Sequence, residues 1–224
     1  MPPAPPANFD RLARLYAPLE WLSFGRALSR RRLHFIDDPR VARARRALVL
    51  GDGDGRFSAA LLARYPSLEL TAVDASAQML TQLERRVRTQ TPHAALTLCC
   101  ADLRHWAAPA QNFDLVVSHF VFDCLTTQEL DTLIARVTPA LAPRACWLIS
   151  DFAIPQLNPW HLLARLLVRT LYFGFRVLTG LTVTRLPDHA PLLRSHHFQL
   201  ASADTACGGI LRSELWQRAT ERPV

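Results

Sequence analysis

Apolar and polar positions along residues 46–152 follow two alternating patterns. Short apolar runs are typical of buried strands, and segments with apolar residues three and four positions apart are typical of amphipathic helices. Strands are expected at residues 47–50, 68–74, 95–102, 113–120 and 145–152. Helices are expected between them at residues 56–65, 76–90 and 127–141, with Ser76 and either Thr126 or Thr127 as N-caps. Repeated strand–helix–strand units of this length predict a parallel sheet with helices on both faces.

The pattern differs on either side of this region. Residues 9–46 have helical spacing interrupted near Pro18, and the arginines at 30–32 are expected on a solvated helix face. Residues 157–183 are strongly apolar, but regularly spaced arginines predict an amphipathic helix and not a membrane span. Residues 197–218 are expected to form two strands around a turn at Gly208 and Gly209.

Composition restricts the function classes only in part. The net charge is +7, and all 26 basic residues are arginine. A nucleic-acid surface has no reason to exclude lysine, so compositional bias explains the charge better than nucleic-acid binding does. The five cysteines show no metal-ligand spacing, and they are expected to be reduced thiols. The same spacing predicts no metal site. The first residues lack the features of a signal peptide, so we expect a cytoplasmic protein.

A glycine loop, "GDGDG" at residues 51–55, follows the first strand. Arg56 takes the place of the third glycine of the dinucleotide fingerprint, which argues against a nicotinamide oxidoreductase. Asp74 ends the second strand, 23 positions after Gly51, where a carboxylate can hold a ribose diol. The alternative is that Asp74 is only a cap preceding Ser76.

The third and fourth strands also end in residues with candidate chemistry. The Asp102 carboxylate can accept from an adenine amine while the backbone of Leu103 serves a ring nitrogen, or Asp102 is only a cap. Ser118, His119 and Phe120 end the fourth strand, in the crevice where open α/β sheets bind ligands. His119 has an ordinary pKa suited to a general base, and the alternative is that it packs near the ligand.

Four stretches, "LVLGDGDGRF", "LTAVDAS", "CCADLRHW" and "FDLVVSHFVFDCLT", together resemble the class I S-adenosylmethionine-dependent methyltransferases over residues 46–151. The resemblance implies a Rossmann-like three-layer α/β/α sandwich, with a seven-stranded, mostly parallel sheet whose last strand is antiparallel. It implies an N-terminal helical cover segment at 1–45 and a methyltransferase domain at 46–224. The amphipathic helix at about 157–183 is then an insertion resembling a lid.

The resemblance also implies S-adenosylmethionine as cofactor. Its contacts would be residues of the glycine loop and of the strand ends: Gly51, Asp52, Gly53, Gly55, Asp74, Ala75, Asp102, Leu103, Ser118 and His119. The family often has an acidic residue two positions before the first glycine, where this chain has Val49, so Asp52 is expected to take that role. The cofactor carries an ammonium and a sulfonium but no phosphate, which makes nearby carboxylates favourable.

The implied reaction is methyl transfer to oxygen or carbon of a small, apolar or aromatic acceptor. His119 is the expected catalytic residue, and Tyr16, Phe120, Asp123 and Trp160 are the expected acceptor contacts. Tyr16 can instead be a core residue, and Asp123 a helix N-cap. The apolar segment at 157–183 can cover the acceptor, pack against the domain, form a homodimer interface or contact anionic lipid.

Two other functions remain open from the sequence. Amino-directed base methyltransferases typically carry an Asp/Asn-Pro-Pro-aromatic motif after the fourth strand, where this chain has "SHFVF", so RNA methylation is disfavoured. A non-catalytic protein that binds S-adenosylmethionine as a partner module would keep the same loop. An enzyme would form S-adenosylhomocysteine, whereas a non-catalytic binding protein would not.

Overall fold

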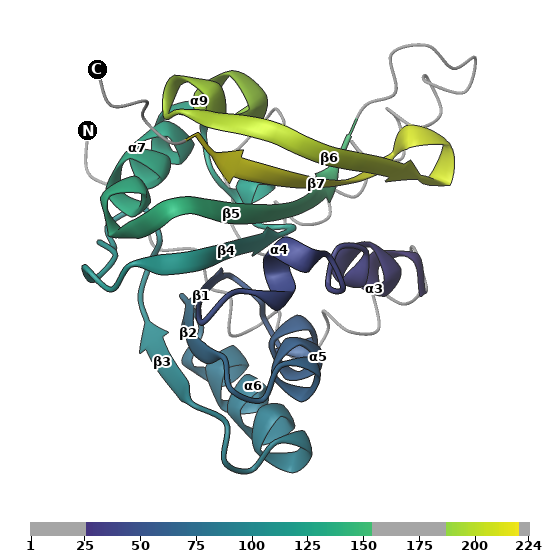
Figure 1. The fold of residues 1–224 in the computed structure, drawn as a ribbon, viewed down its shortest axis with the longest axis vertical. Coiled ribbons are helices and arrows are strands. Elements are labelled where there is room, and N and C mark those ends of the chain that lie inside the picture. Colours follow the sequence, from purple (N-terminus) through teal and green to yellow (C-terminus); the bar gives the residue numbers. More distant parts are fainter. Residues whose placement is uncertain (1–25, 154–186, 220–224) are drawn as a thin grey trace.

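A computed structural model describes residues 26–153 and 187–219, which contain a seven-stranded sheet in the order β3-β2-β1-β4-β5-β7-β6 (Figure 1). Strands β1 to β5 are parallel to one another, and β7 is antiparallel to both β5 and β6. From β1 the chain adds β2 and β3 toward one edge of the sheet, and β4 and β5 follow on the other side of β1, so the switch point lies between β1 and β4. Open α/β sheets bind ligands at such a switch point, beyond the carboxyl ends of the strands.

The strands begin and end close to the positions that the apolar runs predict. Their bounds are β1 Arg46–Leu50, β2 Glu69–Asp74, β3 Leu96–Cys100, β4 Phe113–His119, β5 Leu141–Phe152, β6 Phe198–Ala206 and β7 Leu211–Arg218. The two final strands pair around Gly208 and Gly209 as expected. Strand β5 begins four residues earlier than its expected start at residue 145.

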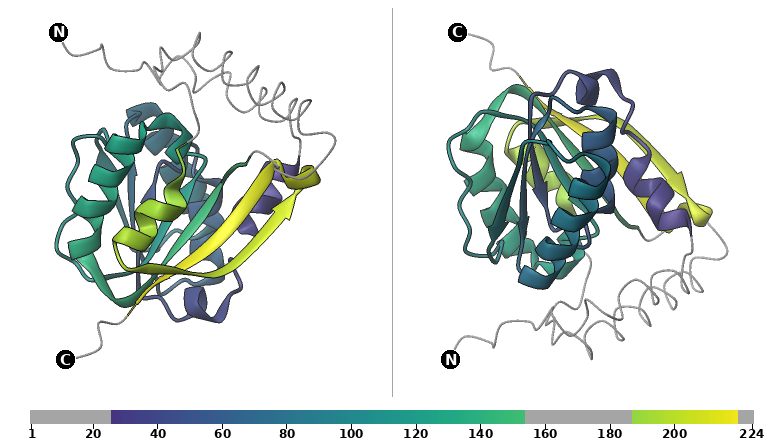
Figure 2. Two further views of the ribbon diagram at one scale, coloured as in Figure 1. Left: turned by 90° about the horizontal axis from the view of Figure 1, so that it is seen from above. Right: turned by 90° about the horizontal axis from the view of Figure 1, so that it is seen from below.

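Helices cover both faces of the sheet, as Figure 2 shows. Their bounds are α3 Arg26–Leu33, α4 Pro39–Ala42, α5 Arg56–Arg64, α6 Ala77–Gln90, α7 Thr127–Val137 and α9 His189–Ser195, with short 3-10 turns η1 Phe122–Cys124, η2 Thr138–Ala140 and η3 Cys207–Gly209. Ser76 caps α6, and Thr126 forms a capping box with Glu129 at the start of α7. Helix α7 ends before Pro139, and α9 was not among the predicted helices.

The core lies on both faces of the central strands. Along β1, Leu48 and Leu50 contact the cluster under α7 and α9, and Ala47 and Val49 contact the cluster under α5 and α6. All four side chains are buried, which explains why this strand is an uninterrupted apolar run. The three-layer α/β/α sandwich with an antiparallel last strand is therefore confirmed.

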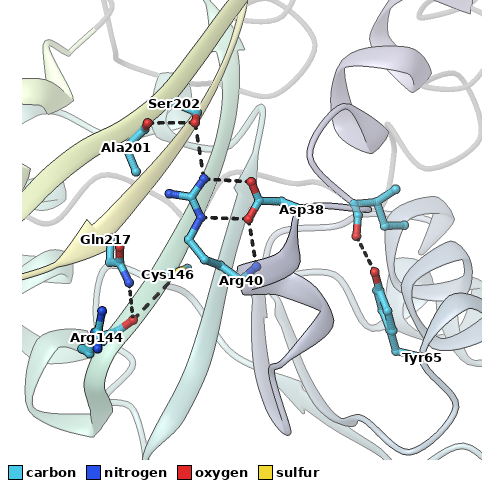
Figure 3. Close-up of polar contacts among 9 residues, drawn as sticks. Asp38, Arg40, Tyr65, Arg144, Cys146, Ala201, Ser202 and Gln217 are labelled. Atoms are coloured by element: carbon cyan, nitrogen blue, oxygen red, sulfur yellow. Dashed lines mark hydrogen bonds and ion pairs between the residues drawn. The ribbon is translucent and has the colours of Figure 1, made fainter.

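The described part of the N-terminal segment is not one continuous helix. Asp38 caps α4 and binds the Arg40 guanidinium through both carboxylate oxygens, at 2.8 Å each (Figure 3). Arg40 also donates to Ser202 Oγ of β6 at 3.4 Å, and Tyr65, the C-cap of α5, donates to the Ile36 carbonyl at 3.0 Å. These contacts link residues 36–40 to β6 and to the end of α5.

The arginines at 30–32 do not form a solvated face. Only Arg30 is exposed, while Arg31 pairs with Asp204 and Arg32 is buried, with 8% of its surface exposed. The Arg31 carbonyl at the end of α3 accepts hydrogen bonds from Ser150 Oγ at 3.1 Å and Ser213 Oγ at 3.0 Å. Helix α3 is therefore held on β5 and β7, which a pattern of local spacing cannot reveal.

Candidate functional site

The glycine loop between β1 and α5 needs its glycines for backbone geometry. Gly51, Gly53 and Gly55 have φ values of 67°, 59° and 77°, in the left-handed region that other residues rarely adopt. A Cβ at Gly51 would lie 2.5 Å from Val121 Cγ2, and one at Gly55 would lie 2.4 Å from Leu83 Cγ. The nearest atom to a Cβ at Gly53 would be Met79 Sδ, at 3.9 Å. This spacing leaves room for a ligand to approach the loop.

The two aspartates of the loop have different partners. Asp54 Oδ2 accepts from Arg56 Nε at 3.0 Å and from an Arg86 guanidinium nitrogen at 2.8 Å, so it ties α5 to α6. Asp52 Oδ2 accepts from the Ser58 backbone N–H at 2.8 Å. Asp52 thereby satisfies one of the unpaired N–H groups in the first turn of α5.

The second carboxylate oxygen of Asp52 is buried and has no hydrogen-bond partner among the described residues. Burial raises the pKa of this carboxyl to about 6, although the Ser58 hydrogen bond and the nearby Arg32 oppose the rise. A buried oxygen without a donor is costly, and a cationic ligand group would satisfy it. Asp52 therefore fits the role expected from the missing acidic residue at Val49.

Asp74 joins the end of β2 to the glycine loop. Its Oδ2 accepts from the Gly53 N–H at 3.1 Å, and its Oδ1 accepts from the Ser76 N–H at 2.9 Å. The cap contact that the sequence offered as an alternative is thus present, together with a contact to the loop. A carboxylate has about four acceptor positions, so one carboxylate oxygen can accept more than one hydrogen bond. Ala75, which follows, is exposed beside it.

The expected adenine-binding carboxylate already has a strong partner. Both oxygens of Asp102 bind the Arg104 guanidinium, at distances from 2.6 to 3.0 Å. Burial opposes the shift, but the hydrogen bonds from Arg104 hold the pKa of Asp102 below its ordinary value. An adenine amine would therefore share this carboxylate with Arg104. The Leu103 side chain is buried in the core, which leaves its backbone as the group that a ring nitrogen could contact.

Ser118 and His119 at the end of β4 point to opposite faces of the sheet. Ser118 Oγ accepts from Trp147 Nε1 at 3.0 Å, so this side chain belongs to the core. His119 packs edge-on against Phe57 of α5, with ring centroids 4.6 Å apart, and is 5% exposed. Neither ring nitrogen has a hydrogen-bond partner among the described residues.

His119 does not have the ordinary pKa that the sequence argument assumed. Burial, and secondarily the positive charge of Arg32, lower its pKa to about 3. The imidazole is therefore neutral at physiological pH and a weak proton acceptor. This finding favours the interpretation in which His119 packs and forms hydrogen bonds near the ligand over the interpretation in which it is a base.

Phe120 follows in a strained backbone conformation. Its φ is 56°, in a region that a bulky residue rarely adopts, and its N–H donates to the Ser150 carbonyl at 2.7 Å. The half-buried ring lies 5.3 Å from the ring of Phe152 and 5.2 Å from the guanidinium carbon of Arg32. Such strain is concentrated at functional sites, and here it places an aromatic ring at the switch point of the sheet.

Two further acidic residues lie near the carboxyl ends of β4 and β5. Asp123 is within η1, and Thr126 caps the next helix, so Asp123 is not the N-cap that the sequence offered as an alternative. Asp151 is buried, and burial together with the negative charge of Asp123 raises its pKa well above the ordinary value. Sequence reasoning missed Asp151 because it continues an apolar strand and lies next to no recognisable motif.

Some expected contacts lie outside the described residues. These are Tyr16, Trp160 and the whole segment 157–183, so the predictions of a lid, a dimer interface and a lipid contact also lie there. Within residues 26–153 and 187–219, no helix combines the length and apolar character that a membrane crossing requires. Arg32, which touches Phe120, was also missed, because the local pattern placed it on a solvated face.

Comparison with known proteins gives consistent matches. Residues 47–144 match the family model for a methyltransferase domain. The malonyl-[acyl-carrier protein] O-methyltransferase of Halorhodospira halophila is 32% identical over 152 residues, which are 67% of this chain and 48% of that protein. This chain thus spans about half the length of the curated relatives it matches.

Solved structures share the fold at lower identity. The S-adenosylmethionine-dependent methyltransferase SibL in its apo form has a TM-score of 0.69 and 17% identity, over 97% of this chain and 64% of SibL. An S-adenosylmethionine-dependent methyltransferase from Methanosarcina mazei has a TM-score of 0.60 and 18% identity, over 79% of this chain and 93% of that one. At these identities the structural matches establish the architecture.

Proposed function

This chain belongs to the class I S-adenosylmethionine-dependent methyltransferase family, and on that premise we propose that it transfers a methyl group to oxygen or carbon of a small, apolar or aromatic acceptor. The observation that carries the proposal is the position of Asp74. Its carboxylate accepts from the glycine loop and from the start of α6, at the strand end where a carboxylate can hold the ribose hydroxyls.

The remaining residues of the loop fit the same cofactor. Gly53 leaves open space for a close approach, and the buried Asp52 oxygen suits an ammonium group. Near the Asp102–Arg104 pair, the Leu103 backbone is available for a ring nitrogen. S-adenosylmethionine supplies a methyl group already activated on a sulfonium. The protein then contributes mainly proximity and alignment of the two reactants.

The end of β4 would border the transferred methyl group. Phe120 and Phe152 form a half-buried aromatic pair there, which supports an apolar or aromatic acceptor. Acidic side chains at Asp123 and Asp151 are the candidates to orient the acceptor or take its proton, because His119 is neutral and a weak base. The curated relatives carry the name O-methyltransferase, which supports oxygen as the methylated atom.

Two measurements test the proposal. Calorimetry should detect binding of S-adenosylmethionine and S-adenosylhomocysteine to the purified full chain. Incubation with S-adenosylmethionine and a panel of phenols, carboxylic acids and acyl thioesters should then release S-adenosylhomocysteine. Tight binding without any release would instead support a non-catalytic S-adenosylmethionine-binding protein. Release with RNA alone, lost at high salt, would support the RNA methyltransferase that the sequence disfavours.

A further inference from the structure

We propose that Arg32 of α3, together with Asp52 and His119, forms a subsite for a zwitterionic amino-acid group, with Arg32 binding its carboxylate. This inference rests on the proposed function, since the group in question is the methionine end of the cofactor. It assigns a cofactor contact to a helix that lies outside the matched residues 47–144.

The first observation is the position of Arg32. Arginine is rarely buried, yet Arg32 is 8% exposed, and its guanidinium lies over the Phe120 ring at 5.2 Å. Phe120 adjoins His119, and the next residue, Val121, lies against Gly51 of the glycine loop. The end of α3, the end of β4 and the glycine loop therefore meet at one place.

The second observation is independent of Arg32. Asp52 Oδ1 and both ring nitrogens of His119 are buried without hydrogen-bond partners among the described residues. Buried polar atoms in native proteins are nearly always paired, and each such exception needs an explanation. Arg32 is close enough to act electrostatically on both of these groups. A bound group with hydrogen-bond donors and acceptors would supply partners for all three of these buried atoms.

The chemistry of the subsite indicates which group this is. A guanidinium is suited to a carboxylate, and a buried carboxylate oxygen is suited to an ammonium. A neutral imidazole has one hydrogen-bond donor, which suits a carboxylate, and one acceptor, which suits an ammonium. An α-amino acid presents a carboxylate and an ammonium on one carbon, so it matches the mixed charge better than a simple anion or cation would.

The protein also fixes the backbone next to Arg32. The carbonyl of the preceding residue, Arg31, accepts from the hydroxyls of Ser150 and Ser213, which are themselves 3.1 Å apart. This contact holds the last turn of α3 on β5 and β7. Ser150 and Ser213 therefore act as positioning residues for the proposed carboxylate contact.

The test compares two ligands that differ only in the carboxylate. Calorimetry of the full chain is done with S-adenosylhomocysteine and with its decarboxylated analogue, which keeps the amine. A charge-assisted contact predicts about 10–100-fold tighter binding of the carboxylate-bearing ligand to the wild-type protein. In Arg32→Gln the preference should fall to about threefold or less, because the affinity for S-adenosylhomocysteine drops while that for the analogue is kept.

Matched variants separate this contact from a structural role. Arg30→Gln removes an exposed arginine of the same helix and should keep the full preference. Arg32→Lys retains the charge and should keep part of the preference, which provides a test if Arg32→Gln does not fold. An equal loss of affinity for both ligands in Arg32→Gln would make Arg32 a structural counterion of Asp52 and overturn the proposal.

The wild-type measurement tests the carboxylate contact separately from the proposed methyltransferase function. Equal affinity of the wild-type protein for both ligands would overturn the carboxylate contact and leave the proposed methyltransferase intact. Absence of binding by either ligand would overturn the proposed function and the subsite together.

Discussion

The Asp54 carboxylate accepts a hydrogen bond from Arg86 at 2.8 Å, and the Arg86 Nε donates to the Asp54 carbonyl at 2.9 Å. The second aspartate of the glycine loop is therefore a tie between α5 and α6. Asp52, two positions earlier, instead has a buried oxygen without a partner among the described residues. One aspartate of the pair stabilises the loop, and the other has the buried oxygen for which we propose a ligand partner.

Asp74→Ala is expected to weaken binding of S-adenosylmethionine by about 1–3 kcal/mol, since hydrogen bonds to a charged group are lost. The loop contact to Gly53 is lost at the same time. Calorimetry gives the affinity, and Asp54→Asn is the matched control because it disturbs the same loop away from the proposed contacts. Unchanged affinity in Asp74→Ala, or an equal loss in Asp54→Asn, would contradict the ribose assignment.

Asp52→Asn is expected to stabilise the protein at neutral pH while weakening cofactor binding. The folded pKa of about 6 is above the ordinary 3.8, so the folded state holds the proton more tightly and stability falls as pH rises between these values. The ionised group thus costs up to roughly 3 kcal/mol above pH 6.

Urea unfolding of wild type and Asp52→Asn at pH 3.5 and pH 7.5 measures this effect. The gain in free energy of unfolding should be present at the higher pH and absent at the lower one. A variant that is less stable at pH 7.5, or that binds S-adenosylmethionine as tightly as wild type, would show that this carboxylate is structural.

His119→Gln is expected to leave the shape of the pH–rate profile unchanged. The pKa of His119 is lowered to about 3, so the ring does not change charge where a free histidine would. Glutamine retains hydrogen-bonding capacity without titrating. Single-turnover rates between pH 5 and pH 9 provide the measurement, and an inflection near pH 6.5 that disappears in the variant would restore His119 as a base.

Gly55→Ala is expected to destabilise the fold by several kcal/mol, because its Cβ would lie 2.6 Å from the Leu83 Cα as well as against the side chain. Gly53→Ala should cost only the left-handed strain of about 1–2 kcal/mol, since its surroundings are open. Denaturant unfolding compares the two variants. Similar losses at both positions would show that backbone strain alone explains the glycines.

The sequence predicted the sheet and the glycine loop well. Apolar residues located β1 and β2 to within one residue, and residues 47–50 of β1 are continuously apolar because this strand is buried on both faces. The glycine spacing located the loop, because its φ values exclude most other residues. These features depend on local conformation and burial, which are visible along the chain.

The roles of individual polar residues were less predictable. Arg32 was expected on a solvated face, but it is buried in a helix that is held on β5 and β7, more than a hundred residues away in sequence. The sequence did not predict that both oxygens of Asp102, the expected adenine contact, bind the Arg104 guanidinium. The pKa of His119 depends on burial and on Arg32. Such properties arise from tertiary packing, which a local pattern does not record.

The two hydroxyls that hold the Arg31 carbonyl come from positions 119 and 182 residues later in the chain. During synthesis, α3 therefore emerges long before its docking surface exists, since β7 must first insert between β5 and β6. Contacts of such large sequence separation form slowly. From this separation we expect the region around Arg32 to be among the last parts of the molecule to fold, after the parallel strands and the glycine loop.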